Sequence, residues 1–327
     1  MNDTMLAIAV RGGTGPADAL ELGSRPRPDP RPGEILIKVA AAGVNRPDIS
    51  QREGNYPPPP GASDIIGLEV AGTVAALGPN VERWSIGDRV TALLPGGGYA
   101  EYAAVDARHA LPVPADMSFE QAAVLPETVY TVWANLFERA QLKAGETVVI
   151  HGGNSGIGVT AIQMANAAGA RTIATCRGPE KTAKAREMGA AIAIDALAED
   201  FAEVVGAAGG ADVVLDIAGG SYFEKNVAVL KTDGRLAQIA LLDGGKVELD
   251  LMPLLFKRLT LTGSTLRGRP ADEKARLTRA IEENVWPWVE SGRVRPPIDR
   301  IFALADASQA HQYLEDGSQF GKVALVP

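Results

Sequence analysis

Short apolar runs separated by glycine and proline fill the first third of the chain. Runs of this length, with glycine turns between them, are typical of closely spaced strands rather than of helices. The pattern therefore predicts a small barrel-like, all-β domain over residues 1–124. Its clearest runs are EILIKVAAAGV (34–44), LEVAGTVAALG (68–78), DRVTALLP (88–95) and YAEYAAV (99–105).

The pattern changes near residue 125, where strand-like and helix-like stretches begin to alternate. Residues 157–170 carry apolar side chains at helical spacing, and residues 180–190 are also expected to be helical. Alternation of this kind indicates parallel βαβ units with right-handed crossovers, and so a doubly wound sheet over residues 125–264. The strand-like runs lie at 146–153, 171–176, 191–195, 211–220 and 235–242.

The sequence pattern does not show to which domain the part of the chain after residue 264 belongs. Residues 270–292 are strongly helical in pattern, and residues 301–327 predict a helix followed by a strand. The pattern alone leaves open whether this tail joins the doubly wound sheet or returns to the first domain.

Composition and charge narrow the class of protein. A chain of 327 residues favours two domains, and 46% hydrophobic with 22% charged residues describes a globular protein. The net charge of -8 opposes a phosphate backbone as partner, so no nucleic-acid binding is expected. Only six apolar residues in a row precede Arg11. They are too short for a signal peptide, and no run approaches a membrane span, so a cytoplasmic protein without a membrane partner is expected.

The stretch HGGNSGIG at 151–158 follows a strand and opens a helix, which is the context of a dinucleotide-binding loop. Gly153 is expected to make the tight turn, and Gly158 to allow close packing of helix on strand. Ser155 replaces the middle glycine of the usual fingerprint. A tight turn without a ligand is the alternative. The predicted pyrophosphate-binding residues are Gly153, Asn154, Ser155, Gly156, Ile157 and Gly158.

The end of the second strand of this domain indicates which cofactor would bind. An enzyme that uses NAD normally has an acidic residue there, but this chain reads TCRGPEK over residues 175–181. Arg177 and Lys181 would flank a 2′-phosphate and favour NADPH, although either could be an ordinary solvated charge at a helix start. Cys176 is the only cysteine, so an intrachain disulfide is not possible. It is expected to be a buried packing residue.

Glu69 stands out in the apolar run IIGLEVAGTV over residues 65–74. A carboxylate in such a run must be paired, hydrogen-bonded or bound to a cation, because burying it alone is unfavourable. The residues alone leave open whether Glu69 belongs to a metal site or is structural.

Several motifs, in this order and spacing, resemble the medium-chain dehydrogenase/reductase superfamily and its zinc-independent quinone oxidoreductase branch. The resemblance implies an α/β protein with a GroES-like β-barrel catalytic domain at 1–124 and 265–327, and a Rossmann doubly wound parallel-sheet domain at 125–264. The tail would thus return to the catalytic domain. The matching stretches are KVAAAGVNRPDISQREGNYPPPPGAS, GLEVAGTV, ALLPGGGYAEY, HGGNSGIG, DIAGGSYFEKN, LLFKRLTLTGSTLR and GKVAL.

Comparison with the zinc-binding members of this superfamily predicts that this chain has no catalytic metal site. Those members carry a histidine before the glutamate, where this chain has Leu68, and a cysteine where it has Asn45. Leucine offers no lone pair to a cation, so no catalytic zinc is expected. Glu69 is then expected to be a structural carboxylate paired with an unidentified basic group.

The resemblance implies an NADPH:quinone reductase that transfers hydride directly from the nicotinamide to a quinone, without metal or flavin. One alternative is an NADPH-dependent reductase of enones or enoyl thioesters. A second, from a different class, is an NADPH-binding structural or RNA-binding protein of the zeta-crystallin type. The strand around TLTGSTL (260–266) resembles the edge that pairs between subunits, so a homodimer is expected.

The resemblance also implies roles for individual residues. Asn45 and Tyr56 would bind the substrate and donate to its developing oxyanion, and Thr131 would lie near the nicotinamide and substrate. Their alternatives are a turn asparagine, an aromatic residue that covers a proline-rich loop, and an ordinary helix residue. Asp48 is expected to be local turn structure. The stretches expected to close over the nicotinamide ribose, or else to be buried packing, contain Leu241, Leu242, Ser264, Thr265 and Leu266.

Two further features of the chain bear on these roles. Ala196 stands where the resembled enzymes place a tyrosine near the 2′-phosphate, so a strict preference for NADPH is not implied. The three histidines show no spacing typical of a catalytic triad, and His151 is expected to be structural.

Overall fold

A computed structural model of the protein describes residues 3–327. Contacts divide the chain into two compact units. Unit 1 comprises the residues up to Thr128 together with Arg267–Asn284 and Pro296–Pro327, and unit 2 comprises Val129–Leu266 and Val285–Arg295. The predicted boundaries lay at 124/125 and 264/265, and residues 285–295, predicted to belong to the catalytic domain, contact unit 2 instead.

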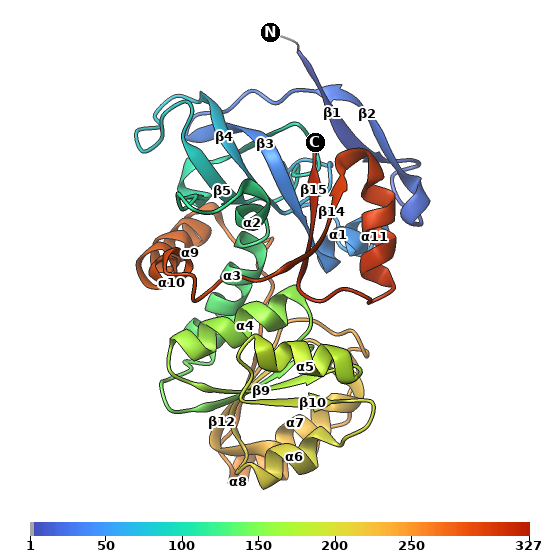
Figure 1. The fold of residues 1–327 in the computed structure, drawn as a ribbon, viewed down its shortest axis with the longest axis vertical. Helices are drawn as coiled ribbons and strands as arrows, with labels where there is room; N and C mark the ends of the chain where they lie inside the picture. Colours follow the sequence, from blue (N-terminus) through green and yellow to red (C-terminus); the bar gives the residue numbers. More distant parts are fainter. Residues whose placement is uncertain (1–2) are drawn as a thin grey trace. The chain divides into compact units, whose positions relative to one another are not determined.

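Unit 1 is built around a sheet of seven strands in the described part of the chain, ordered β14-β15-β3-β4-β5-β7, with β6 paired to β3. All pairs are antiparallel except β14 with β15 (Figure 1). A separate hairpin joins β1 to β2. The strands are β1 (Thr4–Val10), β2 (Leu20–Pro26), β3 (Glu34–Val44), β4 (Glu69–Leu77), β5 (Arg89–Leu93), β6 (Tyr102–Asp106), β7 (Ala110–Pro112), β14 (Ile298–Ala303) and β15 (Lys322–Val326).

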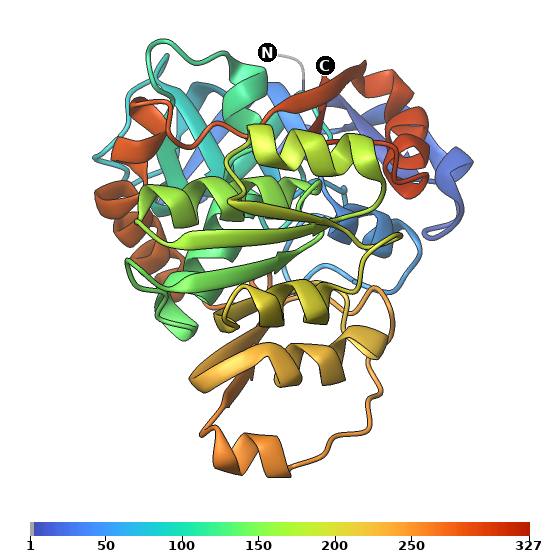
Figure 2. The same cartoon turned by 60° about the horizontal axis from the view of Figure 1, so that its bottom comes forward.

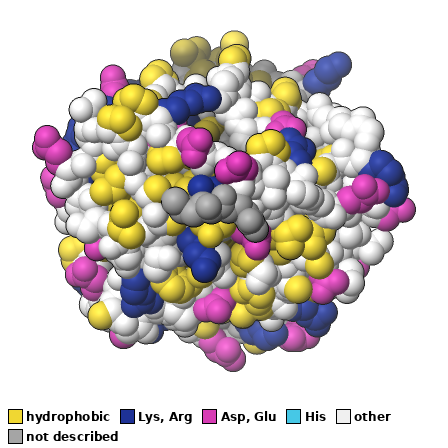
Figure 3. All heavy atoms as spheres, turned by 90° about the horizontal axis from the view of Figure 1, so that it is seen from above, with side chains coloured by type: hydrophobic (Ala, Val, Ile, Leu, Met, Phe, Trp, Pro, Cys, Tyr) yellow, Lys and Arg dark blue, Asp and Glu magenta, His cyan; other side chains and the backbone are white. Residues whose placement is uncertain are grey.

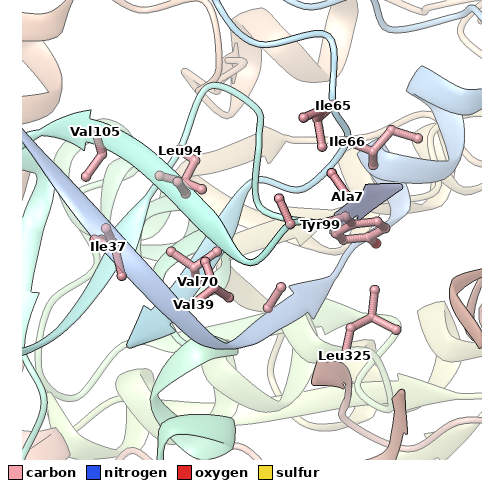
Figure 4. Packing of buried hydrophobic residues seen from close by; sticks show 14 of the residues in the cluster. Ala7, Ile37, Val39, Ile65, Ile66, Val70, Leu94, Tyr99, Val105 and Leu325 are labelled. Atoms are coloured by element: carbon pink, nitrogen blue, oxygen red, sulfur yellow. The ribbon is translucent and has the colours of Figure 1, made fainter. Parts of the chain in front are cut away.

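Side chains from these strands pack into an apolar core in unit 1. Ile37 and Val39 of β3, Val70 of β4 and Leu325 of β15 point into it together with Tyr99 (Figure 4). Alternating burial along β6 shows why its sequence forms a strand with one face covered. The helices of this unit are α1 (Arg46–Arg52), α2 (Phe119–Ala123), α9 (Ala271–Asn284) and α11 (Ala307–Glu315), and α3 (Pro126–Val132) begins in it.

Unit 2 contains a parallel sheet of six strands within the described residues, ordered β10-β9-β8-β11-β12-β13. Its strand β8 is buried at every position, as expected of a strand covered on both faces. Figures 1 and 2 show α4 and α5 on one side of β9 and β10, and α6 and α7 on the other. The strands are β8 (Thr147–His151), β9 (Arg171–Cys176), β10 (Ile192–Asp195), β11 (Ala211–Asp216), β12 (Leu230–Gln238) and β13 (Thr260–Gly263).

The helices of unit 2 follow its strands in the expected alternation. They are α4 (Gly156–Ala167), α5 (Pro179–Glu187), α6 (Phe201–Ala207), α7 (Phe223–Val229), α8 (Met252–Phe256) and α10 (Trp286–Glu290), with a π-helix at Trp133–Arg139 after α3. The predicted α/β class, with a barrel-like β unit and a doubly wound parallel sheet, is confirmed. The pattern missed β14, which is exposed at most of its positions and so shows no alternation of buried and exposed residues.

Candidate active site

The basic partner of Glu69 is Lys322, the first residue of β15. Nζ of Lys322 lies 2.7 Å from Oε1 of Glu69, and the exposed fractions of the two side chains are 3% and 0%. The register explains the meeting, because Val323 pairs with Val44 across β15 and β3 while Val70 pairs with Ala42 across β4 and β3. Glu69 is therefore a structural carboxylate with a buried ammonium partner, as its position in an apolar run required.

Asn45 completes a buried triad with these two residues. Its Oδ1 accepts from Lys322 Nζ at 2.5 Å, and its Nδ2 donates to Glu69 Oε1 at 2.8 Å. The amide orientation is fixed, because an ammonium only donates and a carboxylate only accepts. The contact with Glu69 uses one of the two amide hydrogens, so the second can be offered to a ligand. Asn45 is 7% exposed, which limits that ligand to a close and narrow approach.

Gly43 is required by the same triad. A Cβ atom at this position would lie 2.0 Å from Oε1 of Glu69, which is closer than any real contact. The side chain of Glu69 thus fills the space that a larger residue on β3 would need. This glycine is a packing requirement of the site rather than a turn.

Glu127 reaches the same carboxylate from the first turn of α3. Its backbone N–H donates to Oε2 of Glu69 at 2.8 Å, so Asn45 and Glu127 hold the two oxygens of one group. The side chain of Glu127 is half-buried. Burial, and next the charges of Glu69 and Asp48, raise the pKa of its carboxyl to about 8. Glu127 therefore carries a proton at neutral pH.

Tyr56 is held in place by Arg267. The guanidinium donates to the backbone oxygen of Tyr56 at 3.0 Å and lies 5.3 Å from the centre of its ring. Its other nitrogens donate to Gln51 Oε1 and the Pro95 backbone oxygen, both at 2.7 Å. Burial and next the charge of Glu127 raise the pKa of Tyr56 above its usual value, so its hydroxyl remains a donor.

A second buried chain of polar groups runs from Asp48 to Arg52. Because NH1 of Arg52 can only donate, the Nδ1 atom of His311 accepts from it at 3.4 Å, and the ring proton lies on Nε2. Nε2 is 3.1 Å from the hydroxyl of Tyr99, which in turn lies 3.2 Å from Oδ2 of Asp48. Burial, reinforced by the charge of Arg52, lowers the pKa of His311 to about 3 and keeps the ring neutral.

Asp48 is more than the turn residue that the sequence predicted. Its Oδ2 also accepts from the backbone N–H of Asn45 at 2.7 Å, which is a local helix-start contact. Its Oδ1, however, is buried without a hydrogen-bond partner among the described residues. Burial raises the pKa of Asp48 to about 7 against the opposing backbone hydrogen bond. The local role and the buried chain through Tyr99 thus coexist.

The glycine loop of unit 2 connects β8 to the start of α4. Ser155 precedes α4 as its N-cap, and its Oγ accepts from the N–H of Gly158 at 3.0 Å. A Cβ on Gly158 would lie 2.2 Å from the backbone oxygen of Gly152, so the predicted close packing at Gly158 is confirmed. Gly153 lies inside the tight turn that the N–H of Ser155 closes on the backbone oxygen of Gly152 at 2.8 Å, and Gly152 has a left-handed backbone angle, with φ of 70°. Gly153 also packs closely against Ala174.

The residues predicted for a 2′-phosphate flank the start of α5. Arg177 is exposed at the end of β9, and Lys181 is half-buried in the first turn of the helix. Asp195 of β10, the acid nearest in the sheet register, accepts from the backbone N–H of Gly178 at 2.8 Å. These residues and the loop before α4 fit a phosphorylated dinucleotide. Cys176 is 1% exposed, and burial raises the pKa of its thiol to about 11, so its predicted packing role is confirmed.

Asn135, which the sequence did not single out, connects two predicted cofactor residues. Its Nδ2 donates to the backbone oxygen of Thr131 at 2.9 Å, and its Oδ1 accepts from the hydroxyl of Ser264 at 2.9 Å. Asn135 is buried in the π-helix, a form often found at functional sites. Of the other predicted residues, Leu266 is buried, whereas Thr265, Leu241 and Leu242 are exposed.

His151 is structural in unit 2. It is 1% exposed, with Nε2 at 2.6 Å from Asn226 Oδ1 and Nδ1 at 3.0 Å from Thr175 Oγ1.

No group of three or more His, Cys, Asp or Glu side chains in residues 3–327 is arranged to hold a metal ion. No helix in that part of the chain is long and apolar enough to cross a membrane. Basic and acidic side chains are interspersed on the face in Figure 3.

Comparison with known proteins assigns both parts of the chain. Residues 31–115 match the family of alcohol dehydrogenase GroES-like domains, and residues 156–283 match that of zinc-binding dehydrogenases. A quinone oxidoreductase of Pseudomonas aeruginosa is 33% identical over 304 residues, which are 91% of this chain and 93% of that protein. The chain belongs to the medium-chain dehydrogenase/reductase superfamily.

Two further relatives of this superfamily member differ in size. The structure of Escherichia coli quinone oxidoreductase complexed with NADPH superposes with a TM-score of 0.87 at 27% identity, covering 99% of this chain and 100% of that one. A phthioceranic/hydroxyphthioceranic acid synthase of Mycobacterium tuberculosis is 31% identical over 315 residues. These are 95% of this chain, which spans only 15% of the length of the synthase.

Besides Asn135 and Arg267, sequence analysis did not predict Lys322, Glu127, Tyr99 and His311 as residues of the candidate site. Lys322 stands in the GKVAL motif, and Glu127 in LPETVYT, so both were visible but carried no local sign of their partners. Tyr99 and His311 lie 212 residues apart in the chain yet 3.1 Å apart in space. No local pattern could have joined them.

Proposed function

We propose that this chain is an NADPH-dependent quinone oxidoreductase that passes hydride directly to a quinone. The observation that carries the proposal is the triad in which Lys322 and Glu69 fix the Asn45 amide. It supplies a fixed hydrogen-bond donor whose amide oxygen is held by an ammonium group. A quinone suits such a site, because hydride addition gives an aromatic, delocalised hydroquinone anion that needs no Lewis acid.

When bound, NADPH would supply the hydride. The residues of the chain would orient the cofactor and the substrate and would stabilise the negative charge that develops on the substrate. The loop from Gly152 to Gly158 would hold the pyrophosphate at the start of α4. Arg177 and Lys181 would hold the 2′-phosphate. The residues proposed to contact the nicotinamide end are Thr131, Leu241, Leu242, Ser264, Thr265 and Leu266.

Asn45 and Tyr56 would donate hydrogen bonds to the oxygen on which negative charge develops. Lys322 strengthens the Asn45 donor, because an ammonium at the amide oxygen draws electron density from the amide nitrogen. A preorganised donor of this kind contributes about 2–4 kcal/mol to lowering a barrier.

The similarity to a segment of the acid synthase favours a second candidate, the reduction of an enone or enoyl thioester. The same donors would then stabilise an enolate. Steady-state NADPH oxidation with phenanthrenequinone and with crotonyl-CoA separates the two. We expect kcat/KM to be higher for the quinone, and the opposite order would favour the second candidate. Activity with neither would contradict the proposed function.

Tyr56→Phe should lower kcat for the quinone about 10²-fold, because it removes one donor and leaves the ring and its Arg267 contact in place. Tyr102→Phe on β6 is the matched control and should leave kcat unchanged. A rate in Tyr56→Phe equal to that of the wild type would remove Tyr56 from the proposed site.

Lys181→Ala should raise the KM for NADPH much more than the KM for NADH, because only NADPH carries the 2′-phosphate. Lys184→Ala, on the same helix but paired with Glu180, is the control and should change neither. Equal effects of Lys181→Ala on both cofactors would show that this assignment is wrong.

A homodimer is also proposed. Strand β13 is the last in the order of its sheet, so one edge of it is open to pairing with a second copy. The preceding helix α8 exposes Leu255 and Phe256 at 71% and 74%. Covering this apolar surface would favour association.

A further inference from the structure

Reduction of a quinone or an enone consumes one proton for each hydride, and the donors named so far do not supply it. The amide of Asn45 does not ionise in the physiological range. The pKa of Tyr56 is raised above 10, so the hydroxyl holds its proton. An efficient proton donor has a pKa close to the working pH. The site therefore needs another acid.

Glu127 has the position for this role. Its backbone is fixed by Oε2 of Glu69, while Oε1 of the same carboxylate holds the amide of Asn45. One rigid, buried group thus places both residues on the same side of the site. Unlike Glu69 and Asp48, which are fully buried, Glu127 keeps part of its surface accessible. Glu127 and Asn45 are thus anchored to the two oxygens of the same carboxylate.

Burial, and next the negative charges around Glu127, raise the pKa of its carboxyl and keep it neutral. Glu69 of β4 and Asp48 of α1 face it with negative charge, and both disfavour its ionisation. Lys322 of β15 and Arg267 act in the opposite direction, but Lys322 is hydrogen-bonded to Asn45 and Glu69.

The remaining neighbours are engaged in the same way. The guanidinium of Arg267 donates to Gln51, Tyr56 and Pro95. Lys274 of α9 also faces Glu127, and its Nζ donates to the backbone oxygen of Arg267 at 2.6 Å. Glu127 is thus a half-buried carboxyl among charges that are already paired with other groups.

We propose that the carboxyl of Glu127 is the proton donor of the reaction. The inference rests on the proposed reductase function. The O–H bond of Glu127 breaks as an O–H bond forms on the acceptor oxygen that gained charge from the hydride. The electron pair of the broken bond stays on Glu127 as a carboxylate, which takes a proton from solvent before the next turnover. The acceptor gains one hydride and one proton in total.

Glu127→Gln tests the proposal, because it keeps the shape and the backbone contact with Glu69 but cannot release a proton. We expect kcat to fall about 10²-fold with little change in the KM for NADPH. The wild-type kcat should decline above pH 8, where the acid is lost, and the variant should show no such decline. Glu127→Asp should restore part of the rate, and Glu120→Gln on α2 is the matched control.

Infrared difference spectra of the protein without cofactor give a second readout. Between pH 6 and pH 10, the wild type should lose a protonated-carboxyl band with a midpoint near 8 that is missing in Glu127→Gln. The loss of the Asp48 band, with a midpoint near 7, should be seen in both the wild type and Glu127→Gln. A wild type without reductase activity would overturn the proposed function and this inference together. An active enzyme in which Glu127→Gln keeps its rate and alkaline decline would overturn this inference only.

Discussion

Lys322→Met is expected to lower the free energy of unfolding by about 3–5 kcal/mol, which is the range for breaking a buried ion pair. The substitution removes the ammonium and leaves Glu69, which is fully buried, with only the N–H groups of Asn45 and Glu127. An uncompensated carboxylate in the interior is the cause of the loss. Urea unfolding measures it as a lower midpoint at an unchanged slope.

A double variant separates this charge effect from lost packing. Glu69→Gln combined with Lys322→Met removes both charges, so it should recover much of the stability that Lys322→Met loses. Lys38→Met, at an exposed position of β3, is the control and should stay within about 0.5 kcal/mol of the wild type. A loss below about 1 kcal/mol in Lys322→Met would contradict a buried ion pair at the centre of the site.

The second large effect is expected from His311 in acid. Its pKa is about 3 in the folded protein and about 6.5 when unfolded, so the unfolded chain binds more protons between these values. Stability supplied by the neutral ring is fully present above pH 6.5 and is lost as the pH falls towards 3. The difference corresponds to about 4–5 kcal/mol.

Comparison with His311→Gln isolates this contribution. The pKa values of Asp48 and Glu127 are raised, so their effect on stability has the opposite pH dependence. The stability that their protonated forms give the folded protein is lost as the pH rises through about 7 and 8. The difference between wild type and variant, measured by urea unfolding from pH 7 to 3, should shrink as the pH falls. His109→Gln should give a smaller change, because Asp106 partly offsets the effect of burial on that histidine. A constant difference would show that His311 is not held neutral.

The two predictions concern neighbouring parts of one unit. Asp48 accepts from the backbone N–H of Asn45 and from Tyr99, so it connects the His311 chain to the residue proposed to bind substrate. The ion pair of Lys322 holds the side chain of the same asparagine. Asn45 is therefore fixed through both its backbone and its side chain, which is the preorganisation that a transition-state donor requires.

Much of the fold followed from local pattern. β3 spans the predicted residues 34–44, and β8, α4 and β9 appear in the order that the period changes indicated. The dinucleotide loop was also predictable, because a strand, several glycines and a helix in sequence form it without distant residues. Its details were not: Gly152 has the left-handed backbone angle and Gly153 packs against Ala174, and the pattern of glycines alone does not distinguish these two roles.

By itself, the sequence determined the two kinds of unit and the need of Glu69 for a partner. Each of these is a property of residue type or of local period. Only the tertiary structure decided that the partner is Lys322, 253 residues away, and that Glu127 holds the other oxygen of Glu69. The physical reason is that β15 pairs with β3, and strand order and register depend on the whole core rather than on the residues that they bring together.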